Sequence, residues 1–278
     1  MPEGDTIFRT ARALGRALAG RPLTRFQSTY PLLTRFHDDA PLTGRMVNGV
    51  ESRGKWLLIH FSGGATLATH MLMSGAWHLY RPGERWQQPR ANMRILLENA
   101  EYVAVGFRVP VAQMHTAQSL PRDGRIPSSS LDVLSPEFDT AAAAERVHAC
   151  AQEEIGDVLL HQEVMAGVGN VFKSEICFVC SIHPFAKVAA LSVAQIDQLI
   201  ATAQKLIAAN VMEDSGERIV TFRGLHRRTT HDSDPAESLW VYGRAGEPCR
   251  KCEERVECRP QGPDVRMTFW CPRCQPFP

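Results

Sequence analysis

The sequence has little net charge and no long apolar run. Its 278 residues carry a formal charge of +1 at pH 7, so any surface that binds a polyanion must be local, because the global charge does not supply one. No stretch approaches the length of a membrane-spanning helix. The first twenty residues also contain charges where a signal peptide needs an uninterrupted apolar segment, at Asp5, Arg9, Arg12 and Arg16. We therefore expect a cytoplasmic protein without membrane contacts.

Lysine is scarce, and cysteine is absent from the first half of the chain. Only five of the 31 basic residues are lysine, and the arginines suit bidentate contacts with phosphate. No cysteine precedes Cys150, whereas five of the eight lie between Cys249 and Cys274. In a cytosolic chain such crowding favours a metal site over disulfides.

The C-terminal segment contains two Cys-x-x-Cys pairs, formed by Cys249, Cys252, Cys271 and Cys274. Two such pairs are typical of a closed tetrahedral site, in which four thiolates hold one structural Zn²⁺ per chain. Cys258 lies inside the finger as a spare thiol, and its exchange with a ligand stays open. Residues 266–270 should form a strand of a hairpin, with Arg266 near the turn.

The N-terminus has the chemistry of a nucleophile. Met1 before a small residue is readily trimmed, which would leave Pro2 as a free secondary amine that can attack a sugar or carbonyl carbon and form an iminium. Glu3 is then a general acid or base held beside it by the backbone. Met-Pro-Glu alone is equally compatible with an ordinary N-terminus.

A helix should follow directly, because apolar residues recur at helical spacing before a stop at Gly20, namely Ile7, Ala11, Leu14 and Leu18. From Leu23 to about Gln113 the pattern changes to short β-rich runs, including 55–61, 65–70, 93–98 and 102–107. Many short strands separated by Gly, Pro and Asn predict a sandwich or barrel. Lys55 begins one strand after a Gly turn, where a solvated Lys is also common.

Two further residues could contact DNA if their turns face it. Met73 stands before a Ser-Gly turn and could act as an apolar wedge between base pairs. Arg108 follows the strand 102–107 and could reach an orphaned base. Core packing for Met73 and simple surface exposure for Arg108 are the alternatives.

Residues 121–136 are rich in Pro, Ser and Gly and should link two domains. Asp139 should cap a helix over 140–152, and Ser192 with Gln195 forms a capping box ahead of a helix to about Asn210.

Between these helices, Gly167-Val168-Gly169-Asn170 should end one helix and let Asn170 cap the next. Such a turn can hold a phosphate, or it can be a simple helix joint. Cys177 and Cys180 are expected to be buried thiols. The polar segment 215–238 could form a mobile basic loop, with Arg218, Arg223, His226, Arg227, Arg228 and His231.

Together these motifs resemble the bacterial DNA glycosylase/lyase family of formamidopyrimidine-DNA glycosylase and endonuclease VIII. The resemblance covers nearly the whole chain, through Met1-Pro2-Glu3-Gly4, Ser52-Arg53-Gly54-Lys55, Gly167-Val168-Gly169-Asn170, Trp240-Val241-Tyr242-Gly243-Arg244 and Cys271-Pro272-Arg273-Cys274-Gln275.

The resemblance implies an α+β fold. It consists of an N-terminal helix and β-sandwich (1–120), a linker (121–136), a helix-two-turns-helix module with a basic loop (137–243) and a zinc-finger hairpin (244–278). Damaged or abasic double-stranded DNA would lie in the cleft between the domains. The protein would be a bacterial monomer, associated with the nucleoid when bound to DNA.

The resemblance also implies the roles of the candidate residues. Pro2 would form the Schiff base, Glu3 would shuttle protons, and Lys55 would contact the sugar or its phosphate. Asn170 and Arg266 would grip phosphates beside the flipped-out nucleotide. Met73 and Arg108 would fill the gap that it leaves.

The start Pro2-Glu3-Gly4-Asp5 resembles the endonuclease VIII branch, which favours oxidised pyrimidines as substrates. Met73-Ser74-Gly75 resembles the other branch, so oxidised purines remain the alternative. His161 stands where the family usually has Asp. A catalytically silent sensor of damaged DNA, and a zinc-ribbon interaction protein, are the readings of a different class.

Overall fold

The computed structural model describes residues 2–211 and 238–278. The chain divides into two compact units, Met1–Ser128 (unit 1) and Ser129–Pro278 (unit 2), with the boundary inside the segment expected to link two domains. The predicted α+β class is confirmed. Met1 and all of the expected basic loop except Ser238 lie outside the described residues. In the part that is described, no helix is long and apolar enough to span a membrane.

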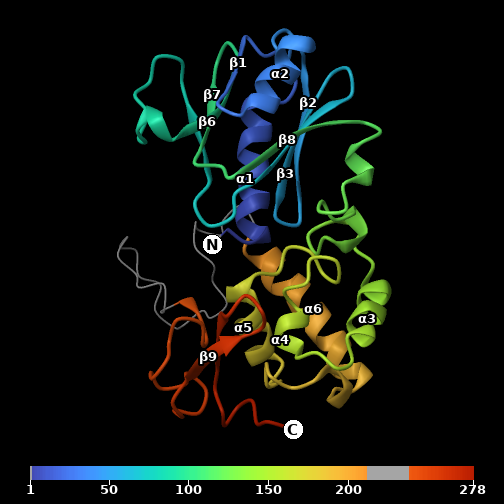
Figure 1. The fold of residues 1–278 in the computed structure, drawn as a ribbon. Helices are drawn as coiled ribbons and strands as arrows, with labels where there is room; N and C mark the ends of the chain where they lie inside the picture. The colour runs from blue at the N-terminus through green and yellow to red at the C-terminus, as the bar shows by residue number, and fades with distance from the viewer. Residues whose placement is uncertain (1, 212–237) are drawn as a thin grey trace. The chain divides into compact units, whose positions relative to one another are not determined.

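Unit 1 is a β-sandwich with a helix along it (Figure 1). The first sheet has the order β1-β6-β7-β5, and the second has the order β2-β3-β4-β8. The strands are β1 (Arg25–Ser28), β2 (Val47–Arg53), β3 (Trp56–Phe61), β4 (Ala65–His70), β5 (Ala76–Tyr80), β6 (Met93–Glu98), β7 (Val103–Phe107) and β8 (Val111–Thr116). All neighbouring strands are antiparallel, as the short strands and tight turns of the sequence predict.

The predicted first helix is α1 (Gly4–Leu18), and its apolar stripe is buried as expected. Ile7, Leu14 and Leu18 belong to one core cluster with residues of both sheets, such as Leu57 and Leu97. Helix and sandwich therefore share one core, which fixes the start of α1 relative to the strands.

Helix α2 (Pro31–Asp39) lies within the region for which the sequence indicated only strands. Pro31 occupies the first turn, where its missing N–H costs nothing. Of the nine residues only Leu33 is buried, so the helix has too narrow an apolar stripe to be recognised from periodicity. Strand β3 begins at Trp56, one residue later than expected, because Gly54 (φ +59°) and Lys55 form the turn between β2 and β3.

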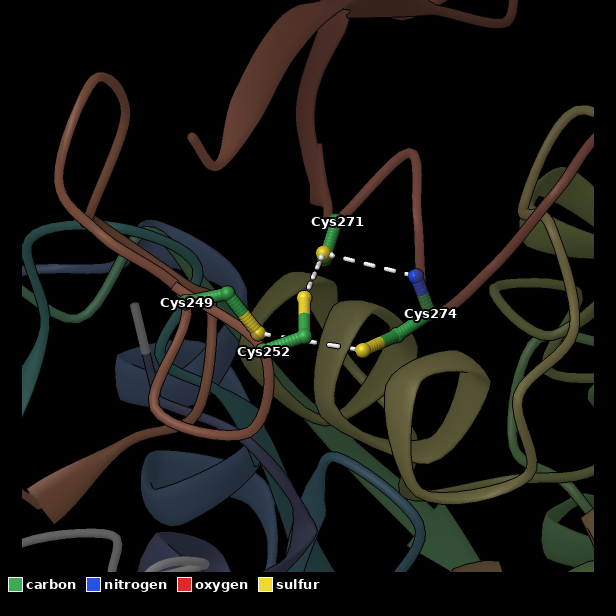
Figure 2. Close-up of side chains that lie close together, drawn as sticks. All are labelled: Cys249, Cys252, Cys271 and Cys274. Atoms are coloured by element: carbon green, nitrogen blue, oxygen red, sulfur yellow. Dashed lines mark hydrogen bonds between the residues drawn. The ribbon is translucent and has the colours of Figure 1, made fainter. Parts of the chain in front are cut away.

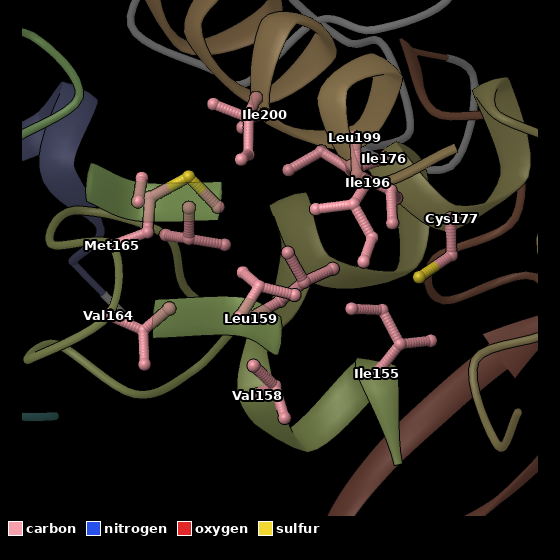
Figure 3. Close-up of a cluster of buried hydrophobic side chains, with 14 of the residues drawn as sticks. Ile155, Val158, Leu159, Val164, Met165, Ile176, Cys177, Ile196, Leu199 and Ile200 are labelled. Carbon is pink, nitrogen blue, oxygen red and sulfur yellow. The ribbon is translucent and has the colours of Figure 1, made fainter. Parts of the chain in front are cut away.

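Unit 2 contains a helical core and a C-terminal hairpin. Its helices are α3 (Thr140–Ala149), α4 (Ile155–Val158), α5 (Asn170–Val179) and α6 (Val193–Ala209), and its strands are β9 (Glu257–Gln261) and β10 (Arg266–Trp270). Figure 3 shows the apolar core that α4, α5 and α6 build. The predicted caps are confirmed: Asp139 accepts from the Ala142 N–H, and Ser192 and Gln195 form the capping box.

The Gly-x-Gly-Asn turn differs from the prediction in two ways. Helix α4 ends at Val158, so the glycines do not terminate it directly. Asn170 is not the N-cap of α5 either, because Gly169 holds that position in an extended conformation and Asn170 is the first helical residue. The Asn170 side chain is thereby released from capping and reaches the hairpin instead.

Candidate active site and metal centre

Pro2 and Glu3 lie at the start of α1. Pro2 is half-buried, and Glu3 is fully buried and occupies the N-cap position with extended backbone. Its carbonyl accepts the Ile7 N–H at 3.1 Å. The partial positive charge of a helix N-terminus favours a carboxylate or phosphate here.

The helix α1 runs antiparallel to β2, which determines where its start lies. Just beyond the helix, the Gly20 N–H bonds to the carbonyl of Val47 at 2.9 Å, and Gly15 faces Val50. From Gly20 back to Glu3 the helix spans about 25 Å, and from Val47 the strand covers about 23 Å up to its turn into β3. Glu3 therefore lies at the end of the sandwich where β2 turns into β3.

Strand register places other predicted residues at the same end. Trp56 pairs with His70, and His70 pairs with Val111. Lys55 immediately precedes Trp56, and Arg108 stands three residues before Val111. Unit 1 thus collects its candidate catalytic residues and its candidate DNA contacts at one end, although they come from four separate segments of the sequence.

The turn of residues 71–75 presents two apolar side chains to solvent. Met73 is 65% exposed and Leu72 is 46% exposed, so the core-packing alternative for Met73 is wrong. Leu72 has φ of +44°, which is strained for a non-glycine residue. The sequence analysis missed Leu72, because its position after a buried strand gives no sign of exposure.

Arg108 is adjacent to this turn. It is exposed, has φ of +47°, and donates from Nη2 to Gln88 Oε1 at 3.1 Å. The Ser74 hydroxyl donates to the Arg108 carbonyl at 3.5 Å. The structure therefore brings the Met73 turn and Arg108 together. This proximity is needed if both side chains are to fill the gap left by one flipped-out nucleotide.

The side chain of His70 stabilises this turn through a hydrogen bond to its backbone. Its Nδ1 accepts the Leu72 N–H at 3.1 Å, so the ring must be unprotonated at that atom. Burial lowers the pKa of His70 below its ordinary 6.5, and the Lys55 charge lowers it further.

This lowered pKa predicts a stability that depends on pH. The folded protein binds fewer protons than the unfolded chain just below pH 6.5, so the contribution of His70 is complete above that pH and is lost as the pH falls through the folded-state pKa. Proton NMR of the His70 ring should give a midpoint below 6.5. His70→Gln, which keeps an acceptor but does not titrate, should lose less unfolding free energy than wild type between pH 7.5 and 5.5. An ordinary midpoint in wild type would contradict this account.

In unit 2, Asn170 and the hairpin are directly connected. The Asn170 amide donates to the Met267 carbonyl at 2.8 Å, next to Arg266, the first residue of β10. Among the described residues, the buried Oδ1 of Asn170 has no hydrogen-bond partner. Arg266 is partly exposed, and its Nη2 lies 3.7 Å from Oδ2 of Asp264. The two residues expected to hold phosphates therefore come from distant segments but lie at one place.

Two buried charges that the sequence analysis missed hold this arrangement. Lys173 and Glu175 on α5 are both fully buried. The Lys173 ammonium donates to the Thr268 hydroxyl at 2.6 Å, which ties α5 to β10. Glu175 accepts the backbone N–H groups of residues 240–242 at 2.8 to 2.9 Å. The sequence did offer a signal, because Lys173 and Glu175 stand among apolar residues on a short helix. Charges that become buried in such a helix need polar partners elsewhere in the fold.

Removing the Glu175 carboxylate should be strongly destabilising. Glu175→Ala leaves three backbone N–H groups without their acceptor, and we expect a loss of about 3–5 kcal/mol of unfolding free energy. Glu175→Gln keeps one acceptor oxygen and should lose less. Denaturant unfolding of the two variants measures the difference, and equal stabilities for Glu175→Ala and wild type would show that water replaces the carboxylate.

The four predicted cysteines form one cluster (Figure 2). The Sγ atoms of Cys249 and Cys274 are 3.9 Å apart, and those of Cys252 and Cys271 are 3.4 Å apart. A zinc–sulfur bond of about 2.3 Å in a tetrahedral site separates the sulfurs by about 3.8 Å. The donor set and its spacing therefore fit a zinc ion. Cys258 is not in the cluster and faces Phe269 across the hairpin.

Backbone groups already support this centre. The N–H groups of Lys251 and Cys274 point at the sulfurs of Cys249 and Cys271, at 3.4 and 3.5 Å. Burial raises the pKa of Cys271 to about 11, and the neighbouring thiols Cys252 and Cys249 add to the rise. A cation removes this penalty, because thiolates are the binding form.

The remaining cysteine predictions are also confirmed. Cys177 is fully buried and Cys180 nearly so. Burial raises the pKa of Cys177 to about 12, so this thiol is inert rather than a ligand.

Two family models match the chain: the formamidopyrimidine-DNA glycosylase N-terminal domain over residues 1–108 and the formamidopyrimidine-DNA glycosylase H2TH domain over residues 130–221. A probable endonuclease 8 2 of Streptomyces coelicolor is 38% identical over 100% of this chain and 95% of its own length. The DNA-(apurinic or apyrimidinic site) lyase Nei2 of Mycolicibacterium smegmatis is 36% identical over 99% of both chains.

A solved structure also has a similar fold. The Lactococcus lactis formamidopyrimidine-DNA glycosylase, solved non-covalently bound to DNA with an AP site, superposes with a TM-score of 0.79 at 21% identity, over 99% of this chain and 100% of the other. The sequence relatives extend over the whole chain, from the buried Glu3 to the four-cysteine cluster. The chain therefore belongs to the formamidopyrimidine-DNA glycosylase and endonuclease 8 family.

Proposed function

We propose that the protein is a DNA glycosylase and AP lyase of base excision repair that acts on oxidised bases. The observation that carries the proposal is the convergence of Pro2, the buried Glu3 and Lys55 at one end of the sandwich. An amine nucleophile, a carboxyl group and a cation are the groups that Schiff-base chemistry on an anionic sugar requires.

The proposed reaction begins at the N-terminal amine. With Met1 removed, the Pro2 nitrogen attacks C1′ of the damaged nucleotide, the C1′–N bond to the base breaks, and the base leaves with a proton. Glu3 protonates the ring oxygen O4′ as the sugar opens to an iminium. Loss of a C2′ proton then expels the 3′ phosphate, and a second elimination expels the 5′ phosphate, so the strand is nicked and the amine is regenerated by hydrolysis. Lys55 stabilises the phosphate charge.

Residues of unit 2 would bind the phosphate backbone of the DNA. Asn170 at the start of α5 and Arg266 beside it suit the phosphates that flank the lesion. Zinc bound by Cys249, Cys252, Cys271 and Cys274 would serve a structural role, because four thiolates leave no open position for a substrate.

Arg266→Ala should weaken DNA binding uniformly across sequences. Loss of one phosphate contact lowers the slope of log affinity against log salt by about 1. Arg35→Ala, which removes an exposed arginine on α2, is the matched control and should leave the slope unchanged. Fluorescence anisotropy between low and high salt measures both, and equal slopes for wild type and Arg266→Ala would remove Arg266 from the contact set.

Met73 and Leu72 would enter the stack once the damaged nucleotide has flipped out, and Arg108 would face the orphaned base. Two exposed apolar side chains on a strained turn suit such a wedge. Leu72 and Met73 have no side-chain hydrogen-bonding groups with which to read base edges, so this turn would act in damage recognition rather than in the reading of sequence.

The relatives named endonuclease 8 favour the oxidised-pyrimidine branch. The test is borohydride trapping of the wild-type protein on duplexes with thymine glycol, 8-oxoguanine or an abasic site. Fastest trapping among the damaged bases on thymine glycol would support the pyrimidine preference, and fastest trapping on 8-oxoguanine would select the purine alternative.

Binding to all three duplexes without trapping or nicking, in protein shown by mass spectrometry to lack Met1, would leave a damaged-DNA sensor. We further propose that the protein acts as a monomer in the bacterial cytoplasm and associates with the nucleoid when bound to DNA.

A further inference from the structure

A second group of metal-ligand side chains lies in unit 2, outside the four-cysteine cluster. Cys150, Glu153 and His161 each offer one ligand atom, and these atoms lie within 4.8 Å of one another. The imidazole Nε2 of His161 is 3.6 Å from Glu153 Oε2. None of the three takes part in the proposed glycosylase chemistry.

The first two ligands stand on a pinned turn. Cys150 is the C-cap of α3, and the Glu153 N–H closes the turn onto the Cys150 carbonyl at 2.9 Å. The Val188 N–H bonds to the Glu153 carbonyl at 3.0 Å, and the Ala189 N–H bonds to the Ala151 carbonyl at 2.9 Å. The backbone that carries the thiol and the carboxylate is therefore fixed before any ion binds.

His161 comes from a second fixed segment, directly after α4. Its N–H bonds to the Val158 carbonyl at 3.1 Å, and its own carbonyl accepts the N–H groups of Val164 and Met165 at 3.0 Å. Ligands on two rigid backbones lose little conformational entropy on binding an ion, which raises affinity.

The donor set selects the class of ion. Thiolate, imidazole and carboxylate together are ligands for zinc and its neighbours in the transition series, whereas magnesium and calcium take oxygen ligands. Zinc bonds of about 2.0–2.2 Å to nitrogen and oxygen place these two ligands about 3.4 Å apart, close to the separation of His161 and Glu153. A fourth position is open to water.

The local charge also favours a cation. The carboxylates of Glu153 and Glu163 both repel negative charge at the Cys150 sulfur. A divalent ion would reverse this repulsion and stabilise the thiolate.

We propose that Cys150, Glu153 and His161 form a second, exchangeable site for a divalent ion of the zinc class. The ion would join the end of α3 to the segment that leads into the Gly167 turn. That segment continues into Gln162, whose side chain bonds to the carbonyls of Leu160 and Val168 at 2.8 and 3.1 Å and accepts the Gly167 N–H at 3.0 Å. This inference is independent of the glycosylase proposal.

The test uses tag-free, full-length protein whose four-cysteine site has been filled with zinc. Cobalt(II) is then titrated. One cobalt ion per chain should bind as a second equivalent of metal, and it should show the near-ultraviolet charge-transfer band of a single thiolate. His161→Gln and Cys150→Ser should each weaken this binding at least about tenfold. His148→Gln and Cys258→Ser, an exposed imidazole on α3 and a half-buried thiol on β9, are the matched controls and should keep it.

Two results would overturn the proposal. One is the absence of a second equivalent with a thiolate band, and the other is a second equivalent that persists in both His161→Gln and Cys150→Ser. If Cys150→Ser does not fold, His161→Gln carries the test, because its side chain is 31% exposed and its loss leaves the core intact.

Discussion

Replacing Pro2 with glycine is expected to lower the rate of borohydride trapping on abasic DNA by about a thousandfold. The variant keeps an N-terminal amine, but a primary amine with a free backbone loses the secondary-amine iminium and the orientation that the proline ring provides. DNA binding should stay within about twofold, since the side chains proposed to contact phosphate, Lys55, Asn170 and Arg266, are unchanged. Trapping kinetics and anisotropy on the same duplex separate the two effects.

Glu3→Gln is the companion variant for this experiment. Glu3 is fully buried beside Pro2, and losing general acid–base catalysis should cost about 10²–10⁴-fold in base release while attack of the amine on a pre-formed abasic site is less affected. Wild-type trapping rates in Pro2→Gly would show that the proline ring is not required, and that the nucleophile is either the new glycine amine or another amine of the chain. Mass spectrometry of the peptide that carries the trapped DNA would then identify it.

Removal of the metal from the four-cysteine cluster is expected to unfold the finger and lower DNA affinity about 10–100-fold. Structural zinc supplies about 10–16 kcal/mol of apparent binding energy in finger peptides, far more than the small cluster around Val241 and Val256 can replace. Displacement of Arg266 would remove its proposed phosphate contact, and a charge-assisted hydrogen bond of this kind is worth about 1.5–3 kcal/mol.

The measurement is DNA affinity and circular dichroism after chelation, with readdition of zinc as the reversal. Cys271→Ser should reproduce the chelated state. Cys258→Ser is the matched control and should keep both metal and affinity, because Cys258 lies outside the cluster. Full affinity in metal-free protein would mean that bonds from α5, such as Lys173 to Thr268 and Asn170 to Met267, hold the hairpin in shape without the metal.

Much of the fold and the site was predictable from local signals. The helix from Gly4 follows from apolar spacing, the capping box at Ser192 from side-chain chemistry, and the four-cysteine cluster from the pairing of cysteines. Each of these signals acts over a few residues, so neighbouring positions carry enough information. The helix α2 escaped prediction because only Leu33 on it is buried, which leaves no periodic stripe.

The sequence by itself determined which chemical groups are present: a proline next to a carboxylate at the N-terminus, four thiols in two pairs, and a Gly-x-Gly-Asn turn. Only the tertiary structure decided which of them meet. The Asn170 side chain bonds to the carbonyl after Arg266 instead of capping its helix, and Leu72 is exposed beside Met73. Both outcomes depend on contacts between residues far apart in the chain, where packing and the pairing of buried polar groups outweigh local preference.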